Sequence, residues 1–281
     1  MIRQIAVGLA ALVVGVGAAQ AQSGALMARG KYLVDTLMTC HNCHTPRGPN
    51  GLMMDKALSG GLRFNEKPFD VTAANITSDR ETGIGTWSVD DIKKTLTTGV
   101  RPNGIPLANV MPTGFYRILT TTDLDAIATY LHSVPPVKNK VPAPIYRMAL
   151  PQTVVPNAQH PMSDADLKDK VKRGFYLATI SHCMECHSPL GPKGRDFTRM
   201  GAGGFEMKGP WGVTVSRNIT SSKTKGIGEW TDDEIKRAIT QGIRKDGTKL
   251  RPPMGFQFYA QMKPDDLDAI VAYLRTVPAI D

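Results

Sequence analysis

The sequence has few cysteines and few aromatic residues, and beyond its first 21 residues it has no long apolar run. Only four of its 281 residues are cysteine, and aromatic residues make up 6%. Basic residues outnumber acidic ones by 34 to 25, but they are scattered and are not interleaved with aromatic residues, which argues against nucleic-acid binding. No later segment is apolar enough to span a bilayer, which takes about 20 residues.

The one apolar run lies at the N-terminus and predicts export. Arg3 precedes a run of small and branched apolar residues that ends at Ala18, and Ala19-Gln20-Ala21 then has the small-x-small pattern of a signal peptidase site. We therefore predict a cleavable signal peptide over residues 1–21 and a periplasmic protein. The competing interpretation is an uncleaved membrane anchor, for which the run is short.

The remaining chain is an internal duplication. Segments that recur at an offset of 143 residues are "CHNCHTPRGP" (40–49) with "CMECHSPLGP" (183–192), "NIT" (75–77 with 218–220), "GIGTW" (83–87) with "GIGEW" (226–230), and "DLDAIATYL" (123–131) with "DLDAIVAYL" (266–274). "RGKYL" (29–33) matches "RGFYL" (173–177) at 144, so the approach to the cysteines differs by one residue. We predict two copies of one module.

The copies define a first module over residues 22–134 and a second module over 162–281. Between them, residues 135–161 contain seven prolines, which exclude a helix or a central strand and indicate an extended linker.

Residues typical of helix starts and helix ends recur in both modules, whereas the residue patterns typical of strands are weak. Thr231 and Glu234 have capping-box spacing and Gly242 can end that helix, and Ser88 and Gly99 repeat the pattern. A last helix is expected from Thr122 as its cap in the first module and near Pro264 in the second. We predict an all-α fold of two small helical domains, each completed by a large apolar cofactor because its own core is small.

All four cysteines lie in two Cys-x-x-Cys-His motifs, Cys40, Cys43 and His44 in the first module and Cys183, Cys186 and His187 in the second. This spacing is the signature of c-type haem attachment, in which both thiols bond the porphyrin and the histidine coordinates iron. A disulfide and thioredoxin-like redox chemistry are alternatives, but neither needs the histidine. A zinc site would bring such motifs closer together in sequence than 143 residues.

The repeat also indicates the second axial ligand. Of thirteen methionines, only Met111 and Met254 are related by the offset of 143, and both lie beside prolines ahead of the last helix. Methionine opposite histidine makes a low-spin iron with a raised reduction potential. The ordinary alternative for any methionine is core packing.

Weaker candidates repeat as well. The pair Trp87 and Trp230 could contact a haem edge, and the pair Arg101 and Arg244 could bind haem propionates. The carbonyl of Pro46, or of Pro189 in the second module, could orient the iron-binding histidine.

Each module resembles a class I cytochrome c, with an N-terminal helix, Cys-x-x-Cys-His, and a methionine loop before a C-terminal helix. The motifs "RGKYL", "CHTP", "NIT", "TGIGTW", "MPTGF" and "DLDAIATYL" more narrowly resemble the cytochrome subunits of bacterial alcohol and gluconate dehydrogenases. This chain differs in having two modules where those subunits have three.

The resemblance implies a di-haem electron carrier with two covalent haem c groups. Its donor would be a dehydrogenase, its acceptor a quinone, an oxidase or another cytochrome, and it could associate peripherally with a membrane. A di-haem peroxidase is the alternative function, but it requires one iron with an exchangeable position.

Overall fold

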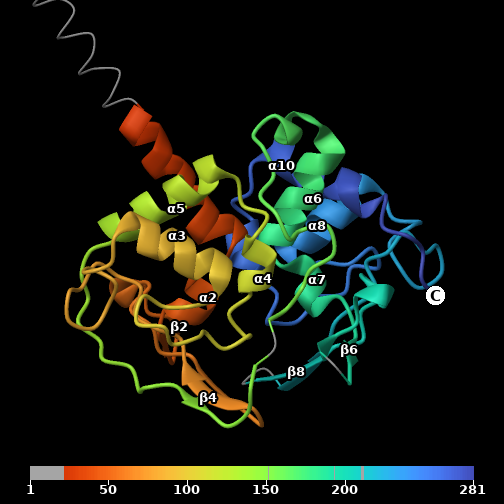
Figure 1. Ribbon diagram of the computed structural model, residues 1–281. Helices are drawn as coiled ribbons and strands as arrows, with labels where there is room; N and C mark the ends of the chain where they lie inside the picture. The colour runs from red at the N-terminus through yellow and green to blue at the C-terminus, as the bar shows by residue number, and fades with distance from the viewer. Residues whose placement is uncertain (1–21, 151, 193, 210–211) are drawn as a thin grey trace, which may run out of the picture.

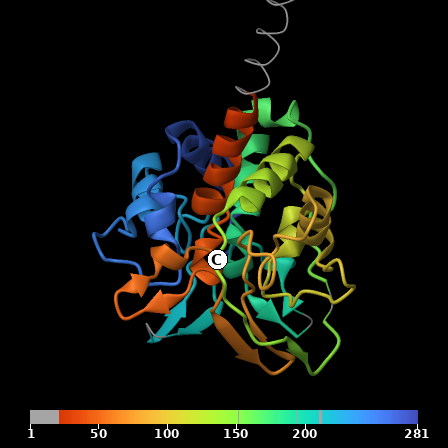
Figure 2. The ribbon, with the colours of Figure 1, turned by 90° about the vertical axis from the view of Figure 1, so that its left-hand side faces the viewer.

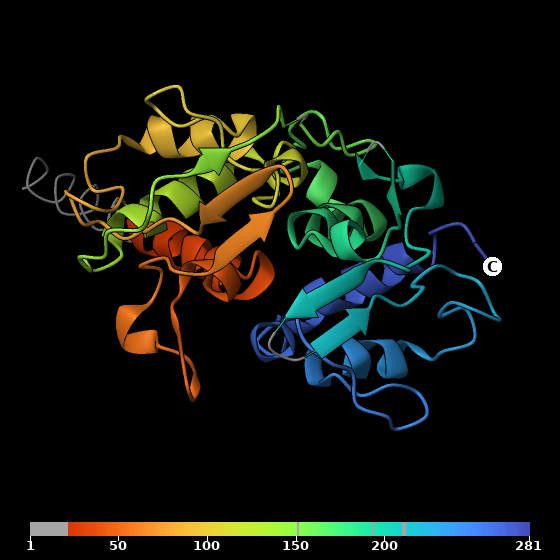
Figure 3. The same ribbon diagram turned by 90° about the horizontal axis from the view of Figure 1, so that it is seen from below.

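The computed structural model describes residues 22–150, 152–192, 194–209 and 212–281. The predicted signal peptide lies outside these residues. The two modules form two lobes that lie side by side, as the view from below shows (Figure 3). Helices occupy one side of each lobe and short hairpins the other (Figures 1 and 2). Within the described residues, no helix is both long and apolar enough to cross a membrane.

The first module begins with a helix over residues 22–32 that continues as the π-helix η1 (Leu33–Leu37). Its other helices are α2 (His41–His44), η2 (Met54–Lys56), α3 (Val89–Thr98), α4 (Thr113–Tyr116) and α5 (Thr121–Ser133). Its strands pair antiparallel as β1 (Arg47–Gly48) with β2 (Gly51–Leu52), and β3 (Arg63–Glu66) with β4 (Phe69–Thr72).

The second module repeats this order. Its helices are η3 (Asp166–Lys168), α6 (Lys170–Ile180), α7 (Cys183–Cys186), η4 (Phe197–Arg199), α8 (Asp232–Gln241), α9 (Phe256–Tyr259) and α10 (Pro264–Leu274). Its strands pair antiparallel as β6 (Leu190–Gly191) with β7 (Gly194–Arg195), and β8 (Glu206–Gly209) with β9 (Gly212–Val215). The fold is therefore mostly helical with small hairpins, and the prediction of an all-α fold missed these strands.

The capping residues agree with the sequence pattern at three of four helices. Ser88 and Thr231 form the predicted capping boxes of α3 and α8, which end at left-handed glycines, and Pro264 opens α10. At α5 the cap is Thr120, whose side chain accepts from the Asp123 amide. The predicted cap, Thr122, instead lies inside the first turn of α5.

The one-residue difference ahead of the cysteines is absorbed as a π-helical turn. The Met38 amide donates to the Leu33 carbonyl at 2.8 Å, five residues back, whereas α6 runs to Ile180 as a regular α-helix. A single inserted residue in a helix produces this widened turn. Because the widened turn takes up the inserted residue, the residues before and after it occupy equivalent positions in the two modules.

The first and last helices of each module cross at a glycine. A Cβ atom on Gly30 would lie 2.0 Å from the Ala126 carbonyl oxygen, and one on Gly174 would lie 1.9 Å from that of Ala269. No side chain fits at either crossing. The glycines of "RGKYL" and "RGFYL" therefore allow the helix backbones to touch.

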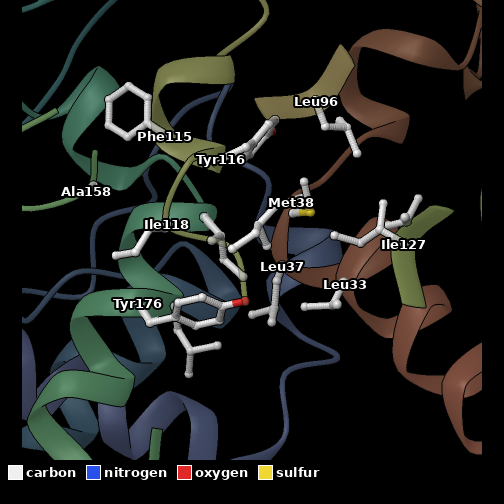
Figure 4. Close-up of a cluster of buried hydrophobic side chains, with 14 of the residues drawn as sticks. Leu33, Leu37, Met38, Leu96, Phe115, Tyr116, Ile118, Ile127, Ala158 and Tyr176 are labelled. Atoms are coloured by element: carbon white, nitrogen blue, oxygen red, sulfur yellow. The ribbon is translucent and has the colours of Figure 1, made fainter. Parts of the chain in front are cut away.

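The two modules share one hydrophobic core. Side chains of η1 and α6, including Leu33, Leu37 and Tyr176, belong to the same buried cluster, and Figure 4 shows them facing one another. The packing is reciprocal, because α9 of the second module contacts η1 and α4 of the first contacts α6.

A buried carboxylate lies on the first module's side of this interface. Asp123 is 3% exposed and accepts two hydrogen bonds from Arg29 of its own module, at 2.8 and 2.7 Å. The hydroxyl of Tyr176, from the second module, donates to the same carboxylate at 2.6 Å.

The second module reproduces this cluster. Asp266 is 1% exposed and pairs with Arg173 of its own module. The hydroxyl of Tyr32, from the first module, donates to Asp266 at 2.8 Å. Each tyrosine thus crosses to the other module's aspartate, and we call these six residues the reciprocal clasp.

The proline-rich linker packs against the protein at two places. β5 (Ile145–Tyr146) adds to β4 as a third strand, and Val155 and Ala158 are buried in the shared core. The linker therefore does not act as a spacer that separates independent modules, because its apolar residues are needed in the core.

Replacing Tyr176 with phenylalanine tests the clasp. We expect the free energy of unfolding to fall by about 1–3 kcal/mol, because a buried carboxylate loses a donor that nothing replaces. Urea denaturation measures the change. Tyr146→Phe is the control, since its hydroxyl donates to the Pro106 carbonyl at 2.6 Å in an exposed setting. Equal losses for both variants would contradict the structural role of the clasp.

Candidate functional site

Each Cys-x-x-Cys-His motif follows a residue in the left-handed backbone region. Thr39 has φ of 48° and His182 has φ of 44°, and the two residues are 143 apart. This conformation is rare for residues other than glycine and accumulates at functional sites. It turns the chain sharply from the preceding helix into the short helices α2 and α7, which carry the cysteines.

The four thiols are free and lie in apolar surroundings. Burial raises the pKa of Cys40, Cys183 and Cys186 to about 12, and that of Cys43 to about 11. Redox-active thiols show the opposite shift, a lowered pKa. No disulfide joins the four cysteines, and no group of three His, Cys, Asp or Glu side chains suited to a metal occurs in the described part of the chain.

The two motif histidines are held through one ring nitrogen. His44 Nδ1 lies 2.7 Å from the Ala74 carbonyl oxygen, and His187 Nδ1 lies 2.7 Å from that of Arg217. A carbonyl only accepts hydrogen bonds, so Nδ1 carries the proton and Nε2 keeps its lone pair. Burial also lowers the pKa of both imidazoles, although this hydrogen bond opposes the shift. Burial thus favours the neutral ring, in which Nε2 is available for a metal.

The prediction that the carbonyls of Pro46 and Pro189 orient these histidines was wrong. Those carbonyls accept from the amides of Met53 and Asp196 at 2.8 and 2.9 Å, in the hairpins that follow each motif. These hairpins, absent from the all-α prediction, draw the proline carbonyls away from the histidines.

The carbonyls that hold the histidines directly precede the repeated "NIT" motif. The Asn75 side-chain oxygen accepts from the Thr77 amide and hydroxyl at 3.0 and 2.7 Å, and its amide group donates to the Val137 carbonyl at 2.7 Å. Asn218 repeats this arrangement and donates to the Ile280 carbonyl at 2.6 Å. The asparagine fixes the local backbone and joins it to the segment after the last helix.

Met111 and Met254 each accept one backbone hydrogen bond at the start of the helix that follows. The Thr113 amide donates to the Met111 carbonyl at 2.8 Å, and the Phe256 amide donates to that of Met254 at 3.0 Å. The first of these hydrogen bonds lies at the start of α4, and the second lies at the start of α9. Neither methionine belongs to the fully buried core.

One large cavity brings the predicted site residues of both modules together. Its volume is about 2570 Å³, well above the range of about 300–1,000 Å³ for a site that holds one small molecule. The predicted ligands that line it are Cys40, Cys43, His44, Met111, Cys183, Cys186, His187 and Met254. Ile92 and Leu96 of α3 and Ile235 and Ile239 of α8 add equivalent apolar faces.

Comparison with known proteins identifies the family. The cytochrome c family model matches residues 171–278, from α6 to the end of the second module. The second module therefore belongs to the cytochrome c family, and the first module repeats its motifs at a constant offset. Haem c is the cofactor of this family, and the chain carries two of its attachment motifs.

Three relatives match this chain along most of its length. The alcohol dehydrogenase (quinone) cytochrome c subunit of Gluconobacter oxydans is 28% identical over 98% of this chain and 59% of its own length. The fructose dehydrogenase cytochrome subunit of Gluconobacter japonicus is 29% identical over 90% of this chain and 53% of its own length. A diheme cytochrome c-type protein of Cereibacter sphaeroides is 28% identical over 86% of this chain and 83% of its own length. The chain thus spans under two thirds of the two dehydrogenase subunits.

The residues of the cavity fit haem c. Two histidines whose Nδ1 is held by a carbonyl line it, two pairs of free thiols lie beside them, and apolar helix faces cover the wall. Thr95 Oγ1 is buried in this wall and has no hydrogen-bond partner among the described residues. A polar group of a bound molecule would satisfy it, as buried polar atoms require.

The weaker candidates also line the cavity. Trp87 and Trp230 pack against the shared core from its edge. Arg101 donates to the Pro106 carbonyl at 2.8 Å, and Arg244 lies 3.4 Å from Asp246. Both guanidinium groups thus have partners within the protein, and propionate binding by them stays a prediction.

Asn75→Ala tests the support behind the first histidine. We expect the free energy of unfolding to fall by about 2–4 kcal/mol, because several buried partners lose their hydrogen bonds together. Asn218→Ala should cost less, since Asn75 is 2% exposed whereas Asn218 is only partly buried. Chemical denaturation of both variants measures the difference, and a larger loss for Asn218→Ala would contradict this ranking.

Proposed function

We propose that this cytochrome is an exported electron carrier with two covalent haem c groups, one in each module. Cys40 and Cys43 would attach the first haem, and Cys183 and Cys186 the second. The axial ligand pairs would be His44 with Met111, and His187 with Met254. When bound, haem iron supplies a one-electron redox couple.

The observation that carries this proposal is the repetition of the full ligand set along one cavity. Each module contributes two thiols, a histidine and a methionine to the wall. Each histidine has an equivalent carbonyl partner at 2.7 Å. A methionine that only packs in a core does not need to recur at the same position in both modules. A buried thiol with a raised pKa does not need a histidine beside it.

The protein groups in the cavity suit electron transfer. The carbonyls of Ala74 and Arg217 fix the histidine rings and make Nε2 a better donor to iron. A thioether opposite histidine favours the reduced state and so raises the potential. Apolar side chains of α3 and α8 exclude water from the same space.

The proposed partners follow from the relatives. The matched proteins are named as cytochrome subunits of alcohol, fructose and gluconate dehydrogenases. A dehydrogenase is therefore the proposed electron donor, and a quinone, an oxidase or another cytochrome is the proposed acceptor. The proposed place of action is the periplasm, with a peripheral contact to the membrane through the donor complex.

A di-haem peroxidase is less well supported. That enzyme needs one iron with an exchangeable sixth position. Met111 and Met254 line the cavity from equivalent loops, so neither module offers a distinct open site. The symmetry supports a carrier.

Replacing Cys40 with alanine should weaken or abolish attachment of the first haem, because one of its two thioether bonds cannot form. Cys183→Ala is the matched change in the second module. Mass spectrometry of the intact protein should show two covalent haems in the wild type and a reduced load in each variant. A wild-type mass that matches four unmodified thiols would contradict the proposal.

Met111→Ala and Met254→Ala should each remove the thioether from one iron. Each variant should lose part of the methionine-to-iron charge-transfer band and show a lowered potential for one haem. The other haem should keep its ligands, since each set comes from a single module, although the modules share a core. Optical spectra and redox titration measure this, and unchanged spectra in both variants would show that the methionine assignment is wrong.

A further inference from the structure

The attachment loop of the first module touches the methionine loop of the second. Asn42 lies between Cys40 and Cys43, and its Nδ2 donates to the Pro253 carbonyl at 3.3 Å. Pro253 directly precedes Met254. The two loops thus meet although 211 residues separate Asn42 and Pro253 in the sequence.

A second contact shows that the loops pack closely. A Cβ atom on Gly255 would lie 3.4 Å from the Thr39 Cγ2 atom, a van der Waals distance, so Thr39 lies against the backbone of Gly255. Thr39 and Asn42 therefore cover the backbone on both sides of Met254.

The orientation of Asn42 is set by a neighbouring arginine. Arg47 Nη2 donates to Asn42 Oδ1 at 2.8 Å and to its backbone oxygen at 3.1 Å. A guanidinium group can only donate, so the amide oxygen must face Arg47. The amide nitrogen is then left to face Pro253, and the assignment of the two amide atoms rests on this contact.

The second module lacks both of these residues. Glu185 stands in the place of Asn42 and Leu190 in the place of Arg47. A carboxylate cannot donate to a carbonyl, and Glu185 instead pairs with His182, 3.3 Å away. Within the described residues no side chain donates to the Val110 carbonyl, which precedes Met111 as Pro253 precedes Met254.

We propose that Asn42 is a positioning residue for Met254, holding the methionine loop of the second haem from the opposite module, while no described side chain does the same for the Met111 loop. This inference rests on the proposed ligand role of Met254. We therefore expect external ligands to displace Met254 from the second haem more slowly in the wild type than in a variant that lacks Asn42.

The test uses single-methionine parents, so that each measurement reports one known haem. In a Met111→Ala parent the remaining charge-transfer band belongs to Met254, and in a Met254→Ala parent it belongs to Met111. Mass spectrometry first establishes that both haems are attached. The rate at which imidazole removes the band then measures how firmly that methionine is held.

Asn42→Ala in the Met111→Ala parent should speed displacement of Met254 roughly three- to ten-fold, the effect of losing one hydrogen bond. Arg47→Leu, which copies the second module, should act in the same direction but less strongly. Asn42→Ala in the Met254→Ala parent should leave the Met111 rate unchanged. Glu185→Ala, the matched truncation, should also leave the Met111 rate unchanged in that parent.

Two outcomes would overturn the inference. If Asn42→Ala leaves the Met254 rate unchanged, or changes the Met111 rate equally, Asn42 does not act across the interface. If the Met111→Ala parent shows two haems but no charge-transfer band, the ligand assignment fails and the inference with it. The first outcome leaves the proposed function intact, so the two failures are distinguishable.

Discussion

The arrangement of the whole molecule depends on two buried carboxylates that neither module satisfies alone. Asp123 and Asp266 are almost inaccessible, and a buried charge is costly unless it is paired and hydrogen-bonded. Each receives an arginine from its own module and a tyrosine hydroxyl from the other. The modules therefore have one relative position in which both carboxylates also receive a tyrosine hydroxyl from the other module. That position also creates the common cavity and brings Asn42 to Pro253.

The reciprocal clasp has the form of a two-fold interface within one chain. In such an interface each contact between positions recurs with the partners exchanged, as Tyr176 to Asp123 and Tyr32 to Asp266 do. Duplication supplies this symmetry without further change, since the same residues occur in both copies. The linker adds to it: Val155 and Ala158 bury in the shared core, so the connection between the copies also stabilises their contact.

Much of the local structure could be predicted, because its signals are local. The capping boxes, the terminal glycines and Pro264 each depend on residues a few positions apart, and the repeat identified the ligand candidates directly. The hairpins were missed because their strands are two to four residues long, too short for a clear alternation. The carbonyls of Ala74 and Arg217 were missed because a backbone acceptor has no side-chain signature. The repeated "NIT" motif was the available signal.

The contacts between modules could not be read from the sequence for a different reason. A proline-rich linker suggests separation, and nothing local indicates that Tyr32 contacts a residue 234 positions away. Yet the departures from the repeat carry information once the interface is known. Asn42 and Arg47 have no equivalents in Glu185 and Leu190, and Thr95 is replaced by alanine in the second module. In a duplicated fold, such substitutions and the inserted residue at η1 make the two sites unequal. Unequal sites suit the proposed carrier, which would receive electrons at one haem and pass them on from the other.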